Sequence, residues 1–440
     1  MTVQITSTTS GGSTPHTAGG RGGSQSLAQK LIARAAGLPS VIVGDIVTCQ
    51  VDLAMFHDSS GPRRLKPMLE ELGAKIWDTS KVVLVMDHYV PERDEASRKI
   101  VKIAREWARE QDLPHVYDSQ GICHIVVPQH GHIQPGMFCV GGDSHSPTGG
   151  AFGAYMFGIG STEMLGVVVT GKIWLRVPQT MAMKWSGQLA PGVCAKDMML
   201  AMIARFGMNG ANYQAVEFTG SAVKALSMQE RMTLCNMSAE LGAQTGLVAA
   251  DDTTRQWLKR PSDVSDLASD AGSFDVEFHF DARTLSPQLA APHSPAHGVP
   301  IAEHAATKID VAYIGACTGA KLDDLRFAAR VLRGKKIASG VQLMLAPASL
   351  QDLAEAKADG TLQILLDAGA TLLPSACGAC AGYSVEGSGF AEGQSIISST
   401  ARNFKGRMGP ASTQVYLASS YTVAASALRG CITDPREVLA

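Results

Sequence analysis

Three cysteines late in the sequence have the type and spacing of ligands for an inorganic cofactor. Cys317 lies in the segment IGACTGAKLDD, and Cys377 and Cys380 form a C-x-x-C pair in SACGACAGY. Both segments are rich in glycine and alanine, so the backbone could wrap closely around a cluster. Three thiolates would leave one iron of a [4Fe–4S] cluster without a protein ligand. That iron could act as a Lewis acid on a substrate hydroxyl and carboxylate.

Zinc binding and thioredoxin-like redox chemistry are alternatives for the C-x-x-C pair. A zinc site usually takes a second close pair of cysteines or nearby histidines, and the sequence provides no such pair. Thioredoxin-like chemistry places the pair at a helix start near the N-terminus, whereas this pair comes late in the chain. The spacing alone therefore leaves a cluster, a zinc site and a dithiol redox site open.

Three short segments carry candidates for acid–base chemistry. They are Asp87-His88 in VMDHYVP, His124 in GICHIVV, and Asp143-Ser144-His145 in GGDSHSPTGG. A histidine beside an aspartate can be held in one tautomer and its charged form stabilised, which suits proton transfer near neutral pH. For any single segment, a turn former or a hydrogen-bonded filler is at least as good an interpretation. We assign no role to His57, His130 and His132.

Two arginines form a further candidate site. Arg402 and Arg407 lie five residues apart in SSTARNFKGRMG. Guanidinium groups bind carboxylates through two parallel hydrogen bonds, so the pair could hold a dicarboxylate. Taken alone, such a segment is more often a solvated loop with surface charges.

The composition narrows the class of protein. The formal net charge is −2, which gives no electrostatic attraction to nucleic acid or an anionic membrane. The longest apolar runs are strand-sized and too short to span a bilayer. Nine scattered cysteines in 440 residues are typical of a reducing compartment, so we expect a cytoplasmic protein. Residues 1–24 are rich in Ser, Thr and Gly, lack the apolar segment of a secretory signal, and are predicted to be a disordered tail.

Alternating strand and helix patterns predict the elements that must position these residues. A helix is expected from Leu27 to Gly37, a strand over Val82–Val85, and an amphipathic helix in EASRKIVKIAREWAREQ. The segments VAYIG, LDDLRFAARVLRG, VQLMLAP and SLQDLAEAKADG repeat this rhythm, which indicates an α/β class with mostly parallel sheets. Asp87, Asp143 and Cys317 each follow a predicted strand, where such sheets bind ligands.

Taken together, these segments resemble the aconitase superfamily, in particular the large subunit of 3-isopropylmalate dehydratase and its relatives. The resemblance runs in order from about residue 40 onwards and rests on these segments of the chain: MDHYVP, GICH, GGDSHSPTGGAFGAYMFGIGSTEM, AVEFTG, LSMQERMTLCNMSAELGA, IGACTGAKLDDLR, CGAC and SSTARNFKGRMG. It implies three-layer aconitase-type α/β domains at residues 25–175, 176–287 (intertwined with the first) and 288–440, the last carrying the cysteines.

The resemblance also implies a role for each residue. Cys317, Cys377 and Cys380 would ligate one [4Fe–4S] cluster with one open iron. The catalytic residues would be Asp87, His88, His124, Asp143, His145 and Glu217, with His124 paired to Glu217. Ser144, Arg402 and Arg407 would bind the substrate. The reaction implied is a hydro-lyase reaction, the reversible removal of water from a hydroxy-dicarboxylate or hydroxy-tricarboxylate such as 3-isopropylmalate.

Two departures and one missing domain qualify these expectations. The family usually has asparagine where this chain has Gly319 and Ala401, which makes a citramalate, dimethylmalate or maleate hydratase-type relative an alternative. A non-catalytic, cluster-bearing regulator is an alternative of another class. The family's final mobile domain is not represented in the sequence, so the resemblance implies a separate small subunit, and this chain alone is expected to be inactive or nearly so.

Overall fold

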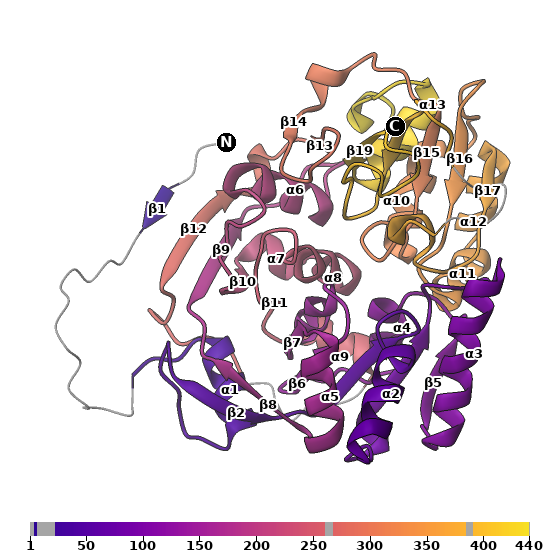
Figure 1. Cartoon of the computed structure of the whole chain (residues 1–440). Helices are drawn as coiled ribbons and strands as arrows, with labels where there is room; N and C mark the ends of the chain where they lie inside the picture. Colours follow the sequence, from indigo (N-terminus) through magenta and orange to yellow (C-terminus); the bar gives the residue numbers. More distant parts are fainter. Residues whose placement is uncertain (1–3, 7–22, 260–266, 384–389, 440) are drawn as a thin grey trace.

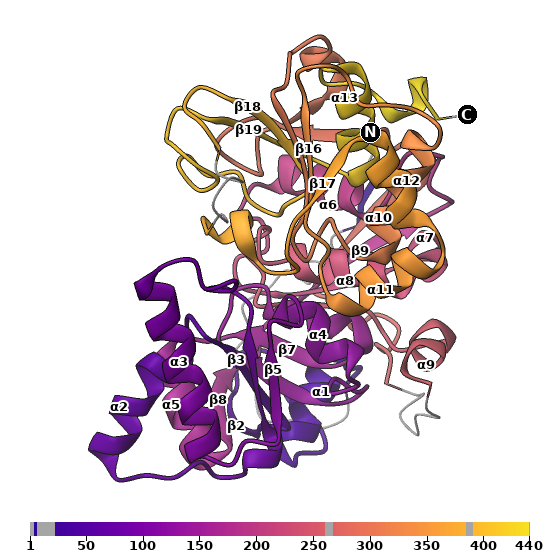
Figure 2. The same cartoon turned by 90° about the vertical axis from the view of Figure 1, so that its right-hand side faces the viewer.

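The computed structural model describes residues 4–6, 23–259, 267–383 and 390–439 of the 440-residue chain. In this part of the chain, three larger sheets and a two-stranded ribbon surround a common centre (Figures 1 and 2). Each larger sheet takes its strands chiefly from one stretch of sequence, and helices of the same stretch connect those strands. We call the stretches that form the first, second and third sheets the first, second and third regions. The arrangement confirms the predicted α/β class with mostly parallel pairing.

The first sheet has the order β5-β4-β3-β6-β7 and is parallel throughout. Its strand β4 is buried along its whole length, as the Val-rich predicted strand requires. The bounds of its elements are β3 (Leu53–His57), α2 (Pro62–Leu72), η1 (Thr79–Lys81), β4 (Val82–Met86), α3 (Glu95–Glu110), β5 (His115–Asp118), α4 (Cys123–Gln129), β6 (Phe138–Gly141), η2 (Ser146–Phe152), β7 (Tyr155–Gly158) and α5 (Ser161–Thr170).

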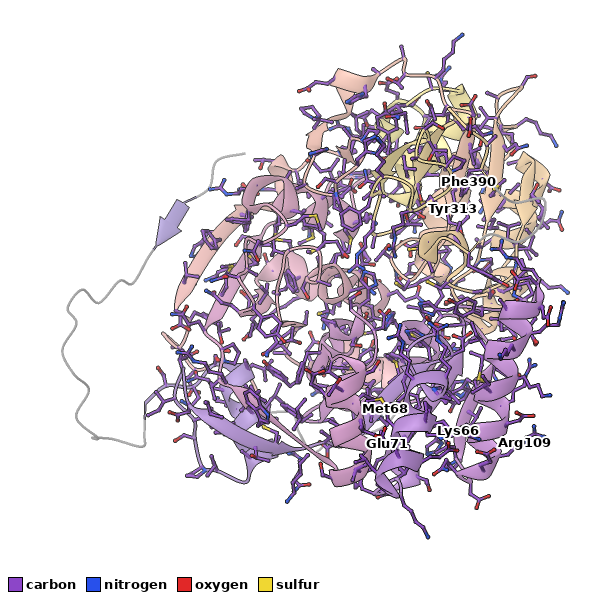
Figure 3. The ribbon with its side chains drawn as sticks, in the orientation of Figure 1. Lys66, Met68, Glu71, Arg109, Tyr313 and Phe390 are labelled. Carbon is purple, nitrogen blue, oxygen red and sulfur yellow. The ribbon has the colours of Figure 1, made fainter. Side chains whose placement is uncertain are left out.

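The outer helices α2 and α3 show how amphipathic sequence becomes packing. Figure 3 labels Lys66 of α2 and Arg109 of α3, and Lys66 forms an ion pair between the two helices with Glu110 of α3. On the inner side, Trp107 of α3 is buried against Phe56 of β3, with ring centroids 5.6 Å apart. The apolar face therefore fixes the helices on the sheet, while the exposed ion pair contributes little.

The ribbon pairs β2 (Ile46–Gln50) with β8 (Lys172–Arg176) in antiparallel fashion. Ile46 and Trp174 are 70% and 68% exposed, which is unusual for large apolar side chains. Helix α1 (Leu27–Ala36) packs beside β2 and ends at Gly37, whose φ of 67° closes the helix. The predicted first helix is confirmed.

The second sheet has the order β1-β12-β9-β10-β11, parallel except at β1. Its elements are β1 (Gln4–Thr6), β9 (Thr180–Ser186), α6 (Ala195–Phe206), β10 (Ala215–Thr219), α7 (Ser221–Ala225), α8 (Met228–Met237), β11 (Thr245–Leu247), α9 (Asp252–Leu258), β12 (Val276–Asp281) and η3 (Ala282–Thr284). Helices α6 and α8 contact each other.

The third sheet has the order β14-β13-β19-β18-β15-β16-β17. Its elements are β13 (Gln288–Ala290), β14 (Gly298–Pro300), η4 (Ile301–His304), β15 (Val311–Ile314), α10 (Leu322–Leu332), β16 (Gln342–Leu345), α11 (Leu350–Ala358), α12 (Thr361–Ala368), β17 (Ala370–Leu372), η5 (Gly378–Ala381), β18 (Ser395–Ser398), β19 (Gln414–Ala418), α13 (Ser420–Arg429) and η6 (Pro435–Glu437). Tyr313 of β15 packs edge-on against Phe390 (Figure 3).

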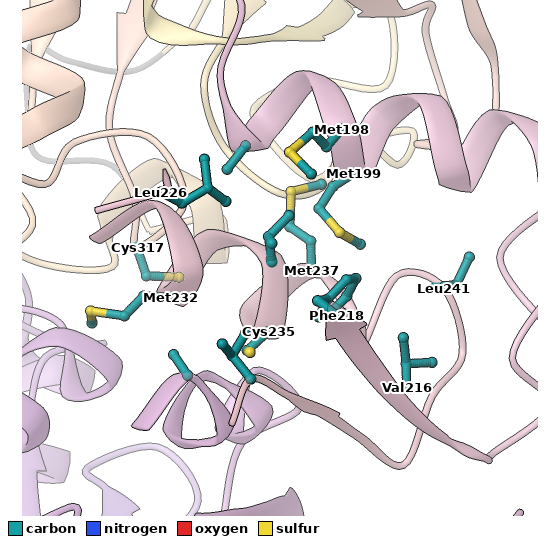
Figure 4. Packing of buried hydrophobic residues seen from close by; sticks show 14 of the residues in the cluster. Met198, Met199, Val216, Phe218, Leu226, Met232, Cys235, Met237, Leu241 and Cys317 are labelled. Atoms are coloured by element: carbon teal, nitrogen blue, oxygen red, sulfur yellow. The ribbon is translucent and has the colours of Figure 1, made fainter. Parts of the chain in front are cut away.

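The common centre is an apolar core built by the second region and extended by the other two. Figure 4 shows methionines of α6 and α8, among them Met198 and Met237, around Phe218 of β10, with Cys317 near Met232. Methionine has three flexible torsions and fills irregular gaps between elements that meet at different angles. The core therefore fixes the loop of Cys317 relative to α8.

The predicted domain divisions can be compared with the sheets. The division at 287/288 coincides with the start of the third sheet at Gln288, and the division at 175/176 falls inside β8. Residues 1–3 and 7–22 of the predicted tail lie outside the described residues, while Gln4–Thr6 pairs with β12. Within the described ranges, no helix is long and apolar enough to cross a membrane.

Candidate functional site

The polar residues predicted to follow strands of the first sheet do lie together. Asp87 and His88 follow β4, and Asp143 and His145 follow β6. Strand β3 lies between β4 and β6 in the sheet, and its carboxyl end contributes His57 and Asp58 to the same place. We refer to these residues, together with His124, as the strand-end cluster.

Asp87 and His88 form one close pair of the strand-end cluster. His88 Nδ1 lies 2.7 Å from Asp87 Oδ1, and the other carboxylate oxygen of Asp87 accepts a hydrogen bond from the Cys123 backbone N–H at 2.7 Å. Burial alone would lower the pKa of His88, but the charge and hydrogen bond of Asp87, together with the charges of Asp143 and Asp58, outweigh burial and raise it to about 9. His88 is therefore a cation at neutral pH and can give up a proton.

His57, to which the sequence assigned no role, stacks on His88. The two ring centroids lie 3.8 Å apart with the planes 7° from parallel. His57 Nε2 is buried, has no hydrogen-bond partner among the described residues, and lies 3.6 Å from Asp143 Oδ2. Asp58 accepts the backbone N–H groups of His88 and Tyr89 and so fixes the turn after β4.

Asp143 is the carboxylate on which the histidines converge. His124 Nε2 lies 2.7 Å from Asp143 Oδ1, and the same oxygen accepts the His145 backbone N–H at 2.8 Å. Burial would raise the pKa of Asp143, but the neighbouring His124 and the hydrogen bonds from His145 hold it well below the ordinary value. At His124, the effect of burial is larger than the opposing effect of the Asp143 charge. The pKa of His124 is therefore lowered, and its imidazole is neutral at pH 7.

Glu240 is a site residue that we did not predict. Its side chain is fully buried, and Oε1 lies 2.9 Å from His145 Nε2 and accepts a hydrogen bond from Arg402 Nε at 2.6 Å. Burial would raise the pKa of Glu240, but His145 and Arg402 lower it to about 2. Burial and the Arg402 charge would lower the pKa of His145, but Glu240 and the hydrogen bond to Asp143 together outweigh them and raise it to about 9. Its segment MSAELGA was part of the resemblance, but its spacing offered no acid–base pattern.

The predicted pairing of His124 with Glu217 is wrong. Glu217 lies on β10, where its Oε2 accepts a hydrogen bond from Ser269 Oγ at 2.6 Å, and His124 bonds to Asp143 instead. Burial raises the pKa of Glu217 to about 7. The strand that carries Glu217 belongs to the second sheet and turns this side chain toward α1, away from the strand-end cluster. The resemblance joined the two residues, but the packing of separate sheets keeps them apart.

The three predicted ligand cysteines come from two loops of the third region. Cys317 follows β15 and the left-handed turn at Ala316 (φ 68°), and its Sγ accepts a hydrogen bond from Asn236 Nδ2 at 3.2 Å. Cys377 begins the turn that contains Cys380, and its backbone N–H donates to the Asp87 carbonyl at 2.9 Å. The Cys377 loop is thereby attached to the strand-end cluster.

The thiols are also electrostatic neighbours. Burial raises the pKa of Cys317 to about 12, and Cys380 adds to this effect. The pKa of Cys380 lies well below its ordinary value because Cys377 hydrogen-bonds to it and because Arg407, His145 and Arg402 are near. Three neighbouring thiols with cations around them fit the three-thiolate ligand set expected for an iron–sulfur cluster, whereas a structural zinc site would take a fourth protein ligand.

Polar atoms without partners surround the same centre. Among the described residues, Glu240 Oε2, Asn236 Oδ1, Arg407 Nε and His57 Nε2 are buried and have no hydrogen-bond partner. Buried polar groups are nearly always satisfied, so a cluster of exceptions indicates a site that receives a further group. Oxygen and nitrogen atoms of His57, Asp58, Asp87 and His88, and of His124, Asp143 and His145, also lie close enough to hold an ion, although most of them already bond to one another.

Two of the three predicted substrate residues, Ser144 and Arg402, border an open cavity, whereas Arg407 is not in its lining and lies near Cys380. Asp143, Ser144 and Arg402 line the cavity together with Tyr213 and Gln244, and its volume is about 440 Å³. Arg402 uses Nε for Glu240, and its terminal amino groups have no hydrogen-bond partner among the described residues. Ser144 is exposed at the rim. A carboxylate could therefore enter beside Arg402 without breaking an existing bond.

The departure at Gly319 has a steric cause. A Cβ atom at this position would lie 2.4 Å from the carbonyl oxygen of Ser399 and 2.3 Å from its side chain. The loop of Cys317 and the loop that leads to Arg402 therefore approach each other more closely than any side chain at 319 would allow. Ala401 is fully buried.

Parallel α/β layers around a buried cluster of acids, histidines and thiols define a protein of the aconitase type. The chain belongs to the aconitase family (aconitate hydratase), which matches residues 38–308 and 302–430. This membership confirms the resemblance drawn from the sequence and implies an iron–sulfur cluster. It also agrees with the predicted hydro-lyase class.

Several whole-length relatives sharpen the comparison. The chain is 41% identical over 420 residues to 3-isopropylmalate dehydratase large subunit 1 of Methanopyrus kandleri, covering 94% of this chain and 100% of that one. It is 44% identical over 392 residues to a probable methanogen homoaconitase large subunit of Methanosarcina mazei, covering 88% and 99%.

A solved structure supports the fold. The crystal structure of Thermococcus kodakaraensis aconitase X in its holo-form superposes with a TM-score of 0.51 and covers 86% of this chain and 89% of that one. At 14% identity, the likeness concerns the fold alone.

Proposed function

We propose that the chain is the large subunit of a [4Fe–4S]-dependent hydro-lyase that reversibly removes water from a hydroxy-dicarboxylate or hydroxy-tricarboxylate of the 3-isopropylmalate type. The observation that carries this proposal is that Cys380 lies near His145 and Arg402, while Arg402 and the Asp143 of the histidine–aspartate cluster line one cavity. Relatives along the whole chain with matching names support it.

Cys317, Cys377 and Cys380 are the proposed ligands. When bound, the cluster would supply an open iron that acts as a Lewis acid toward the substrate hydroxyl. The chain's own contribution is to hold the thiols in place: Asn236 donates to Cys317 Sγ, and the Asp87 carbonyl anchors the Cys377 loop. The buried atoms without partners, Asn236 Oδ1 and Arg407 Nε among them, fit a site that receives further groups.

Protons are handled by the strand-end cluster. His88 is held as a cation by Asp87, and its Nε2 lies 4.0 Å from Asp143 Oδ2, so it can protonate a leaving hydroxyl that lies beside Asp143. His145 is held as a cation by Glu240 and provides a second positive charge. The proton that leaves a carbon next to a carboxylate would be taken by a base that the proposed small subunit supplies, and positive groups arranged before the reaction stabilise the negative charge that develops there.

Arg402 and Arg407 are the proposed carboxylate binders. Glu240 holds the Arg402 guanidinium by Nε, and Arg402 lines the cavity that Ser144 borders. A fixed guanidinium loses less conformational entropy when it binds an anion than a mobile one does. The two arginines would thus orient the substrate's carboxylates relative to His88.

A separate small subunit is the proposed partner. The open side of the site continues into a groove of about 760 Å³ that shares Tyr213 and Gln244 with the site cavity and reaches Trp174 on the ribbon. Ile46 and Trp174 beside this groove are largely exposed. A partner that completes the site from this side would bury both side chains.

One reconstitution experiment tests the function. The chain is loaded with iron and sulfide under anaerobic conditions, combined with its small subunit, and the enoate product is followed by absorbance for 3-isopropylmalate, homocitrate, citramalate, dimethylmalate, malate and citrate. We expect turnover of at least one acid by the pair and almost none by either chain alone. Full cluster content with no turnover of any acid would refute the hydro-lyase and favour a regulator.

The partner surface has its own test. Trp174→Glu should weaken small-subunit binding about tenfold or more, since a buried tryptophan often dominates an interface. Leu72→Glu is the matched control, because Leu72 at the end of α2 is 61% exposed but lies outside the lining of the groove. Equal binding by both variants would place the small subunit elsewhere.

The substrate has a second candidate class. Gly319 and Ala401 take positions where the family usually carries amides, and the steric fit of Gly319 against Ser399 leaves no room for a side chain there. A site that has lost these amides could favour a citramalate, dimethylmalate or maleate hydratase-type reaction. The same panel of acids distinguishes the classes by their relative kcat/KM.

A further inference from the structure

Lys196 is a buried ammonium in a place that is unfavourable for one. The side chain is 2% exposed and belongs to the first turn of α6, where the helix dipole disfavours a positive charge. No carboxylate among the described residues lies within salt-bridge distance of its Nζ, and burial lowers its pKa to about 8. A buried charge without a counter-ion destabilises the folded state, so we expect a function that requires this ammonium.

The hydrogen bonds of Lys196 connect two loops of the third region. Its Nζ donates to Thr318 Oγ1 at 3.2 Å, to the Ser399 carbonyl at 3.0 Å and to the Thr400 carbonyl at 2.6 Å. Thr318 directly follows Cys317, and Thr400 is two residues before Arg402. One ammonium from the second region therefore holds both the loop of a ligand cysteine and the loop of a carboxylate-binding arginine.

The surroundings strengthen this connection. Thr318 Oγ1 also donates to the Ser399 carbonyl at 3.0 Å, and Gly319 permits the close approach of the two loops. The next residue, Asp197, accepts the backbone N–H of Gln288 at 2.8 Å, where the third sheet begins. Glu240 and Cys380 are electrostatic neighbours of Lys196, so its charge lies within reach of the anions of the site.

We propose that Lys196 is a positioning residue that fixes the distance between the cluster-binding loop of Cys317 and the substrate-binding loop of Arg402. This inference rests on the proposed function for its catalytic meaning. The ammonium donates to Thr318 and to the carbonyls of Ser399 and Thr400, so it acts on the site through these two loops. The separation of these loops sets where a substrate carboxylate sits relative to its hydroxyl.

Lys321 provides a matched comparison. It is 1% exposed, and its Nζ donates to Thr233 Oγ1, to the Cys317 carbonyl and to Asp324 at 2.7 Å. It therefore holds the Cys317 loop alone, and Asp324 is its counter-ion. The double variant K321M/D324N removes this ammonium together with its counter-ion and leaves the net charge unchanged.

Hydrogen–deuterium exchange on the cluster-free chain tests the connection without any need for turnover. K196M should speed exchange about tenfold or more in segments 316–320 and 399–403, since it removes charge-assisted hydrogen bonds from both loops. K321M/D324N should speed exchange in 316–320 only, and K196R should restore part of the protection. Unchanged exchange in 399–403 for folded K196M would overturn the proposal.

Kinetics of the loaded enzyme with its small subunit give the second readout. K196M should raise the KM for the preferred acid about tenfold while iron and sulfide content stay at the wild-type level, because the loops lose their fixed separation. A purely structural role would lower only the active fraction and leave KM unchanged, and that result would refute positioning. If K196M does not fold, T318V removes one of the three acceptors and should shift exchange and KM in the same directions.

These measurements separate the two proposals. Absence of turnover by the wild-type pair would refute the proposed function, whereas the exchange pattern of the cluster-free variants would still decide the role of Lys196.

Discussion

The strand-end cluster and the residues that face it from the second sheet reach the same site by different routes. Asp87, His88 and Asp143 follow strands of one parallel sheet and neutralise one another at short range. Lys196, Asn236 and Glu240, which we call the facing residues, come from α6, α8 and the turn after α8, and all three are buried.

The difference between the strand-end cluster and the facing residues indicates two separate roles at the site. The strand-end cluster carries groups that can exchange protons, and its geometry follows from a single sheet. The facing residues join regions: Asn236 reaches Cys317, Glu240 joins His145 to Arg402, and Lys196 joins two loops. Substitutions in the strand-end cluster should therefore affect proton transfer. Substitutions of the facing residues should affect how the loops and side chains of the site are aligned.

The largest effect is expected at the third region's cysteines, on which both groups depend. Cys380→Ala should abolish both cluster binding and turnover, because two thiolates from different loops cannot replace a three-thiolate set. The measurement is iron and sulfide content together with visible absorbance after anaerobic reconstitution. Cys235→Ala is the control, since Cys235 is buried in the apolar core. Normal cluster content in Cys380→Ala would contradict the ligand assignment.

Asp143→Asn should lower kcat about a thousandfold, within the range of general acid–base contributions. The change removes the charge on which His124 and His145 converge and leaves the shape of the side chain nearly intact. Steady-state kinetics of the variant with verified cluster content measure the effect. A loss below about tenfold would show that the strand-end cluster is not the proton-handling group.

Glu240→Gln should lower kcat/KM about a hundredfold and mainly through KM, because Arg402 loses the partner that orients it. The folded state should also lose about 3 kcal/mol, since a buried ion pair is broken from one side. Steady-state kinetics and urea unfolding at pH 7 measure the two effects. Unchanged KM would contradict the role of Glu240 in holding the arginine.

Glu217→Gln is the smallest expected effect on activity, less than about threefold, because the side chain bonds to Ser269 outside the site. Its effect on stability depends on pH. The pKa of Glu217 is raised from 4.5 to about 7 by burial, so its contribution to stability is full below pH 4.5 and is lost as pH rises through 7.

The glutamine variant should therefore be more stable than the wild type at pH 8 by about 3 kcal/mol, with little difference at pH 4.5. Urea unfolding across this pH range measures the difference. If Glu217→Gln lost more activity than Glu240→Gln, that result would show that Glu217 does act in the site.

Much of this protein was determined by the sequence itself. The alternation of strand and helix patterns, with a first helix from Leu27 to Gly37, predicted the α/β class and the positions of Asp87, Asp143 and Cys317 at strand ends. These features are local, because each depends on neighbouring residues or on the general rule that parallel strands present their carboxyl ends on one edge of the sheet.

The tertiary structure decided which of several acidic residues enters the site. Glu217 and Glu240 are both buried glutamates of the second region, but only Glu240 meets His145 and Arg402. Likewise, only the packing of α6 against the third sheet turned Lys196 from a residue in an apolar helix into a link between two loops. Such contacts join residues up to 204 positions apart, and no local pattern encodes them, because they depend on how separately formed sheets pack around a common core.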